Sequence, residues 1–176
     1  MAVYAGSPWL VAFSPDGTRL ATAEGQSVTI WDATNGKKLG EPLEGGAQEV
    51  SSLAFSADGA VLAGGNNDHT LTLWDVKSQE PLVSGLKGHT GEVAGLAFSP
   101  DGATLASASS DRTAILWDVA SIKLSRELKH RLGQVNIVAF SADGTRLPRL
   151  RMKWSASGIW RPASNSANRF VHLMDW

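Results

Sequence analysis

Four copies of one short motif, spaced almost evenly, constrain the fold of this chain more than any other feature. The motif Phe-Ser-(Pro or Ala)-Asp-Gly begins at Phe13, Phe55, Phe98 and Phe140, in steps of 42, 43 and 42 residues. A second motif, Trp-Asp, falls at Trp31-Asp32, Trp74-Asp75 and Trp117-Asp118, in steps of 43 residues. A constant period of this size is typical of proteins that stack copies of one supersecondary unit. The chain is therefore predicted to be a repeat protein.

The third repeat shows what one unit should look like. Four runs of residues in this repeat predict strands. An apolar run covers 93–98, a small-residue run covers 104–109, a run that ends at the Trp of the Trp-Asp motif covers 113–117, and a run of alternating polar and apolar residues covers 123–128. The sequence Ser-Pro-Asp-Gly lies between the first two runs and favours a tight turn. The Pro ring fixes its own φ, the Asp carboxylate can accept a hydrogen bond from the nearby backbone, and Gly tolerates a positive φ. Asp111-Arg112 marks the next turn. Each unit is thus predicted to hold four antiparallel strands.

From about residue 8 to residue 147, the two motifs at one shared period resemble the repeats of the WD-repeat β-propeller family. This resemblance implies one four-stranded blade per repeat, in a ring that usually closes with about 4–8 blades. The expected fold class is all-β: an open arc of about three complete four-stranded antiparallel propeller blades plus a truncated fourth. The repeat domain is expected to span 1–147, with blades at about 8–43, 50–86, 93–128 and, in part, 135–147.

The resemblance also implies a hydrogen-bonded tetrad in each blade, formed by a His that follows Gly, a Ser or Thr of the second strand, the turn Asp and the Trp of the third strand. The third repeat carries the full set, namely His89, Ser109, Asp111 and Trp117, with Ser107 as the alternative hydroxyl. Gly46 stands at the His position of the second repeat, and Gly25 stands at the Asp position of the first. Because a buried polar network stabilises only when every member is bonded, blade three is expected to be the most rigid.

The last segment, residues 148–176, abandons both motifs and carries five Lys or Arg residues against one acid. If its codons are read from their third base, Ser157–Gly158 permits Trp and Gly158–Ile159 permits Asp. Later residues permit a Gly and the run Leu-Gly-Glu-Pro-Leu at the spacing that these residues have between Trp31 and Leu43. We interpret this non-repeat tail as out-of-frame translation after a one-base slip near codon 148. Such a tail is expected to be poorly ordered. The alternative is a genuinely divergent C-terminus.

Little in the sequence supports catalysis. The chain has no cysteine, and no two of its four histidines, at positions 69, 89, 130 and 172, lie at metal-ligand spacing. No phosphate-binding loop, nucleophile elbow or acid–base pair is found. The repeated Trp and Asp residues are interpreted as packing and strand-end residues rather than as ligand-stacking aromatics or an acidic ring. The chain is expected to be non-enzymatic, with no cofactor and no metal; the alternative is a hydrolase on a propeller scaffold.

Binding to other proteins is the function that remains. The formal charge of −1 and the lack of a long apolar run argue against nucleic acid and membrane partners. The N-terminus lacks a secretory signal, which predicts a cytoplasmic location. Rim loops carry specificity on rigid scaffolds. The candidate contact residues on these loops are Gln48, Glu49, Asn67, Asp68, His69, Glu92, Arg112 and Gln134.

The array is similar to the near-identical repeats of bacterial-type multidomain proteins. We therefore interpret the chain as a truncated piece of a larger WD-repeat protein, in which the propeller binds a protein partner for a signalling or NTPase domain. A truncated product without function is the other alternative. The open ends of the arc are expected to favour self-association, because exposed sheet edges invite pairing with other chains.

Overall fold

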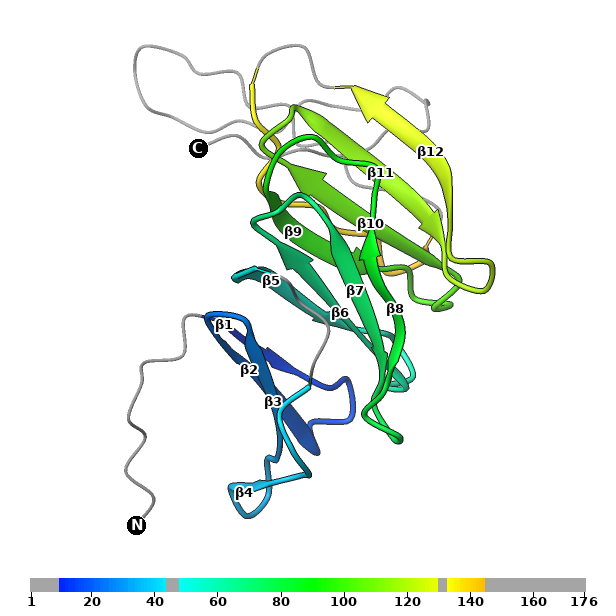
Figure 1. Ribbon diagram of the computed structural model, residues 1–176. Helices are drawn as coiled ribbons and strands as arrows, with labels where there is room; N and C mark the ends of the chain where they lie inside the picture. Colours follow the sequence, from blue (N-terminus) through cyan, green and yellow to red (C-terminus); the bar gives the residue numbers. More distant parts are fainter. Residues whose placement is uncertain (1–9, 44–47, 130–132, 145–176) are drawn as a thin grey trace, which may run out of the picture.

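The computed structural model describes residues 10–43, 48–129 and 133–144, and within these ranges every regular element is a β-strand (Figure 1). Three antiparallel sheets follow one another along the chain, each with its four strands hydrogen-bonded in sequence order. Blade one consists of β1 (Leu10–Phe13), β2 (Arg19–Glu24), β3 (Ser27–Asp32) and β4 (Lys37–Lys38); blade two of β5 (Val50–Phe55), β6 (Val61–Asn66), β7 (Leu71–Asp75) and β8 (Pro81–Leu86); blade three of β9 (Val93–Phe98), β10 (Thr104–Ser109), β11 (Thr113–Asp118) and β12 (Lys123–Lys129). The predicted all-β arc of three four-stranded blades is confirmed.

The turn between the first and second strands of each blade is set by its own sequence. In blade three, Asp101 accepts hydrogen bonds from the Ser99 hydroxyl at 2.5 Å and from the Ala103 amide at 3.0 Å, and Gly102 adopts a φ of 70°. The same Ser–Asp bond, at 2.6 Å, recurs at Asp16, Asp58 and Asp143. The repeated motif therefore closes the same turn in all four repeats, by local contacts alone.

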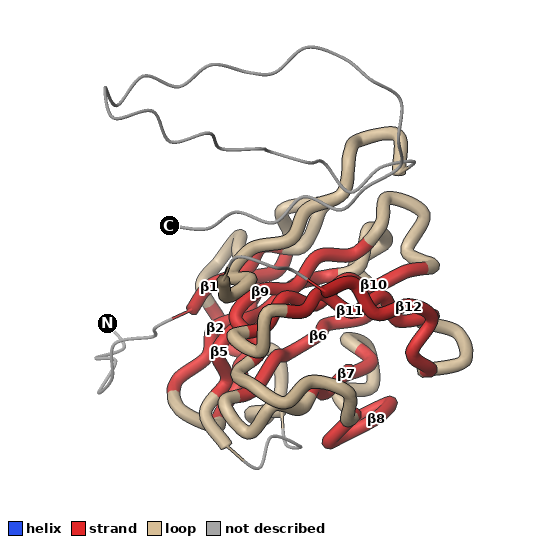
Figure 2. The backbone as a smooth tube through the Cα atoms, turned by 90° about the horizontal axis from the view of Figure 1, so that it is seen from above, coloured by secondary structure: helices blue, strands red, loops and turns tan. Residues whose placement is uncertain are grey.

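The first strands of the three blades, β1, β5 and β9, lie next to one another along the inner side of the arc (Figure 2). Glycines allow this close approach. A Cβ on Gly65 in β6 would lie 2.4 Å from the Ser52 hydroxyl oxygen and 2.6 Å from a methyl group of Val93. A Cβ on Gly95 in β9 would lie 2.5 Å from the carbonyl oxygen of Asn136. A larger residue at either glycine would therefore force neighbouring blades apart.

The hydrophobic cores lie between blades. We call the side of a blade that carries the Phe of its first strand, the Leu of its second strand and the Trp of its third strand its leading face, and the opposite, small-residue side its trailing face. The trailing face of blade one presents Ala21, Ala23, Val28, Ile30 and Leu43 to the leading face of blade two, which inserts Phe55, Leu62 and Trp74. Blade two receives blade three in the same way, with Ala63, Leu71 and Leu73 packed against Leu105, Ile115 and Trp117.

The fourth repeat contributes one short segment. Val135 and Val138 are buried against the trailing face of blade three, and Phe140 is half-buried there. The strand expected at 135–140 is not regular, since Ile137 alone forms a bridge. A regular ladder requires a neighbouring strand that continues the pairing, and within the described ranges no second strand follows this segment. Gly46 and the tail at 148–176 lie outside the described residues.

Candidate interaction surface

Four hydrogen-bonded side chains brace blade three. The Trp117 Nε1 donates to the Ser107 Oγ at 2.8 Å, and that hydroxyl lies 2.7 Å from the His89 Nε2. The His89 Nδ1 lies 3.0 Å from the Asp111 Oδ2. Because a carboxylate only accepts, Nδ1 carries the imidazole proton, and Nε2 then accepts the hydroxyl proton of Ser107. With a neutral imidazole, the network thus runs in one direction, from Trp to Ser to His to Asp.

The hydroxyl of this network belongs to Ser107 and not to Ser109, the residue preferred from the sequence. Trp117 lies diagonally across the β10–β11 pair from Ser107, which is within reach of its indole nitrogen. Ser109 lies at the end of β10, beside the turn. Its hydroxyl donates to the Gly91 carbonyl at 2.9 Å and accepts from the Asp111 amide at 3.1 Å. The two serines point to the same side of the strand, so only their position along it separates their roles.

Burial and hydrogen bonding set the charges within the tetrad. Burial lowers the pKa of the His89 imidazole below its ordinary value of 6.5, although the bond to Asp111 opposes that change. Burial acts to raise the pKa of Asp111, but hydrogen bonds, above all from Thr113, outweigh burial and hold the pKa below 3.8. A neutral imidazole beside an ionised carboxylate fits the geometry, because each bond of the tetrad then has one donor and one acceptor.

These shifts predict that acid destabilises the fold. The unfolded histidine takes up a proton near its ordinary pKa of 6.5, whereas folded His89 resists protonation, so stability is lost as the pH falls below that value. Asp111 adds a further loss below 3.8, because its folded pKa is also lowered. Denaturant unfolding between about pH 8 and about pH 5 should show the first loss. His89→Gln should flatten the curve and His69→Gln should not; a flat curve for the parent chain would contradict this assignment.

Blades one and two lack the complete network. In blade one, the Trp31 Nε1 donates to the Thr22 hydroxyl at 2.9 Å, but Gly25 occupies the turn, with a φ of 60°. In blade two, Gly64 takes the place of Ser107, and the Trp74 ring lies so near that a Cβ on this glycine would be 2.8 Å from it. Both tryptophans therefore pack in their blades without the His–Asp pair that holds Trp117.

The aspartates of the Trp-Asp motifs cap turns. Each accepts hydrogen bonds from the hydroxyl and the amide of a residue just beyond it: Asp32 from Thr34, Asp75 from Ser78 and Asp118 from Ser121. These bonds lower the pKa of all three carboxyl groups below 3.8. The carboxylates are thus engaged locally rather than gathered into an acidic ring. No cluster of His and acidic side chains that could hold a metal ion occurs in the described ranges.

One rim of the arc is formed by the loops that enter each blade and by those that join its second and third strands. In blade two, the Asn67 backbone amide donates to the Glu49 carbonyl at 2.9 Å, and its side chain donates to the Glu49 carboxylate at 3.1 Å. In blade three, the Ser110 amide donates to the Glu92 carbonyl at 3.0 Å. Asp111, in the same turn, also accepts from the Thr90 amide at 2.8 Å. The structure thus ties the two kinds of loop together in both blades.

The predicted contact residues lie on this rim. Asp68 is half-buried, and its carboxylate accepts hydrogen bonds from the Thr70 amide and hydroxyl. The other predicted contact residues are exposed: Gln48, Glu49, Asn67, His69, Glu92, Arg112 and Gln134. His69 and Arg112 occupy the same turn position in their blades, and their φ values are 74° and 71°. Positive φ is uncommon outside glycine, so the two blades share an unusual backbone conformation at this turn. Sequence spacing alone did not reveal this feature.

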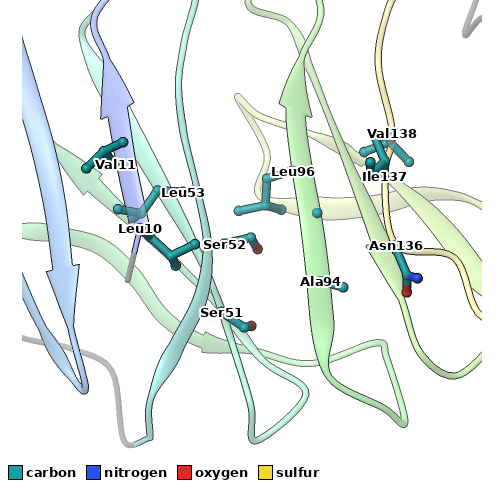
Figure 3. A pocket seen from close by; sticks show the side chains of 11 residues that line it. Leu10, Val11, Ser51, Ser52, Leu53, Ala94, Leu96, Asn136, Ile137 and Val138 are labelled. Atoms are coloured by element: carbon teal, nitrogen blue, oxygen red, sulfur yellow. The ribbon is translucent and has the colours of Figure 1, made fainter. Parts of the chain in front are cut away.

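The inner side of the arc contains an open groove of about 210 Å³ between the first strands of the blades and residues 136–138 (Figure 3). Its lining is aliphatic and small, with Ser51, Ser52 and Asn136 as the polar side chains. Both serine hydroxyls donate to the Val93 carbonyl, at 2.8 and 2.7 Å. No ionisable residue lines the groove among the residues the structure describes, so it offers no acid–base pair. Within those ranges, no helical segment could span a bilayer.

The blades, the cores between them and the polar rim define an open segment of a β-propeller. The WD domain, G-beta repeat family matches the chain over residues 5–32, 36–75 and 80–118. The chain belongs to this WD-repeat family, in agreement with the resemblance carried by its two motifs.

Several known proteins are similar to parts of the chain. The intraflagellar transport protein 122 homologs of Xenopus tropicalis and Homo sapiens are each 36% identical over 61 residues, which is 35% of this chain and 5% of the relative. The crystal structure of the RRP9 WD40 repeats superposes with a TM-score of 0.72 at 27% identity, covering 78% of this chain and 43% of that one. The structure of U3-55K gives a TM-score of 0.72 at 26% identity, covering 78% and 44%. The chain thus spans less than half of these propellers.

Proposed function

We propose that this chain is a non-enzymatic protein-interaction module whose rim loops contact a protein partner. Membership of the WD-repeat family supports a role in protein interaction. The observation that carries the proposal is the rim itself: exposed polar residues sit on loops that are hydrogen-bonded to one another at Glu49–Asn67 and Glu92–Ser110. Binding residues held by a rigid scaffold lose little conformational entropy when a partner binds.

We also propose that this chain is a piece of a larger protein. The chain covers less than half of the solved propellers it resembles and 5% of its curated relatives, which supports a piece of a larger WD-repeat protein. A link to a signalling or NTPase domain and a cytoplasmic location are further parts of the proposal. We also propose that the arc self-associates through its open ends.

A hydrolase on this scaffold is the less favoured function. Chemistry in a central channel needs convergent acids, bases or a metal. The groove on the inner side of the arc presents aliphatic, serine and asparagine side chains, and both serine hydroxyls are already bonded to Val93. Turnover of a panel of hydrolase substrates by the pure chain, lost on a point mutation in this groove, would reverse the preference.

Charge reversal on the rim tests the interaction function. In the double variant Glu92→Lys/Arg112→Glu, two exposed rim charges change sign while the net charge stays the same. The matched control, Lys77→Glu/Glu80→Lys, reverses two exposed charges in a loop between third and fourth strands, at the opposite end of blade two. Each chain is immobilised, and the proteins captured from the source cells are compared quantitatively; affinities of the proteins found are then measured with purified components.

The rim variant is expected to weaken a partner's affinity by at least about tenfold, as for loss of a central contact, and the control to leave it unchanged. Equal capture by parent, rim variant and control would contradict the assignment of the rim, as would capture of nothing by the parent chain.

A further inference from the structure

No residue that the structure describes covers the leading face of blade one, although its residue types match those buried in the other blades. Phe13 is 63% exposed, whereas its counterpart Phe55 is 8% exposed. Val11 is 62% exposed, whereas the counterpart Leu53 packs into the core between blades one and two. Leu20 is half-buried, whereas its counterpart Leu62 is fully buried. In blades two and three this face is covered by the trailing face of the preceding blade.

The two internal interfaces show what chemistry fits this face. Each places the bulky Phe, Leu and Trp residues of a leading face against small residues of a second strand and aliphatic residues of a third strand. Two leading faces would oppose bulky residues to bulky residues and leave gaps, which close-packed interfaces avoid. The fitting partner is therefore a trailing face.

The trailing face of blade three is incompletely covered. It presents Ala106, Ala108, Ala114, Leu116 and Leu128. The segment from Val135 to Phe140 covers its inner part with first-strand residues. Leu116 stays half-buried, whereas its counterparts Leu73 and Ile30 are 2% and 1% exposed under complete blades.

We propose that the leading face of blade one binds the trailing face of blade three in a second copy of this chain, where it displaces residues 133–144. The inference deepens the proposed self-association and does not depend on the rim. The segment from Val135 to Phe140 provides only first-strand side chains. A complete leading face also provides side chains of the second and third strands, so it covers more of the trailing face. The contact is head to tail, and such contacts generate closed rings or open chains.

Sedimentation and light scattering over a range of concentrations test this contact. The parent chain should form species heavier than its 18.6 kDa monomer as the concentration rises. Phe13→Glu should weaken this association at least about tenfold, because it places a charge in the centre of the contact. Leu82→Glu, at a side chain 48% exposed on the outer strand of blade two, is the matched control and should leave the association intact. The rim variant Glu92→Lys/Arg112→Glu should also associate normally, which separates this result from the fate of the proposed rim function.

Because the chain has no cysteine, single cysteines can define which faces meet. A short bismaleimide should join a Val11→Cys copy to a Leu116→Cys copy, and should join neither to a Leu82→Cys copy. Val138→Ala, which loosens the covering segment, should strengthen association. A monomer at every concentration, association that survives Phe13→Glu, or cross-linking of Val11→Cys copies only to one another would each overturn the proposal.

Discussion

Replacing Trp117 by alanine is expected to lower the free energy of unfolding by about 3–5 kcal/mol. The side chain is 2% exposed and fills the interface between blades two and three. Its indole nitrogen also donates to Ser107, so the substitution removes packing and a hydrogen bond together and leaves a cavity between two blades. Denaturant unfolding of the parent and the variant, compared at constant m-value, measures the loss.

Trp31→Ala is the matched control, since Trp31 holds the same strand position in blade one and donates an equivalent bond to Thr22 at 2.9 Å. Trp31 is half-buried, and its face meets no preceding blade, so less apolar surface is lost on its removal. We expect it to cost less than half as much as Trp117→Ala. Equal losses for the two variants would show that position within the arc does not determine what these tryptophans contribute.

His89→Ala is expected to destabilise the chain by about 1–3 kcal/mol, the usual cost of leaving buried partners without a hydrogen bond. The imidazole bridges Ser107 and Asp111, and its loss leaves both groups short of a partner. Asp111→Ala should cost a similar amount, because the carboxylate also accepts from the Thr90 amide at 2.8 Å. Thermal and denaturant unfolding give the two values.

Two controls separate the network from general effects of substitution. His69→Asn removes an exposed histidine from the turn between the second and third strands of blade two, where asparagine tolerates the φ of 74°, and should change stability little. Gly25→Asp introduces the missing turn carboxylate into blade one, where no atom lies within 4 Å of a new Cβ, and aspartate tolerates the positive φ better than most residues. Neither should match the loss at His89. Unfolding of His89→Ala that coincides with the parent would mean that the tetrad contributes nothing.

The local structure of each blade could be predicted from the sequence because its causes are local. The Ser, Asp and Gly of each repeated motif close their turn with bonds between residues two to three positions apart, as at Ser99, Asp101 and Gly102. Alternation and small-residue runs then place four strands in each of the first three repeats. The candidate rim residues followed from the same pattern, since strand order determines which loops share an end of a blade.

The choice between Ser107 and Ser109 could not be made from the sequence. Both lie on the same side of β10 and both are buried. Which one meets His89 depends on the register of β10 against β11 and on how far the indole of Trp117 reaches across it. The same holds for the fourth repeat: the residues at 135–140 have strand character, but among the described residues only Ile137 of this segment forms a bridge, because regular pairing depends on a neighbouring strand.

The sequence by itself determined the repeat unit, its turns and the identity of the residues that fill the cores, because a period of 42 to 43 residues repeats the turn motif and the Trp-Asp motif. The tertiary structure decided which of those residues are covered. Phe13 and Phe55 stand in the same motif, yet one is 63% exposed and the other 8%. The physical reason is that these side chains are buried between blades. Their burial therefore depends on whether a preceding blade is present, and the position of the blade in the arc, not the repeat sequence, determines this.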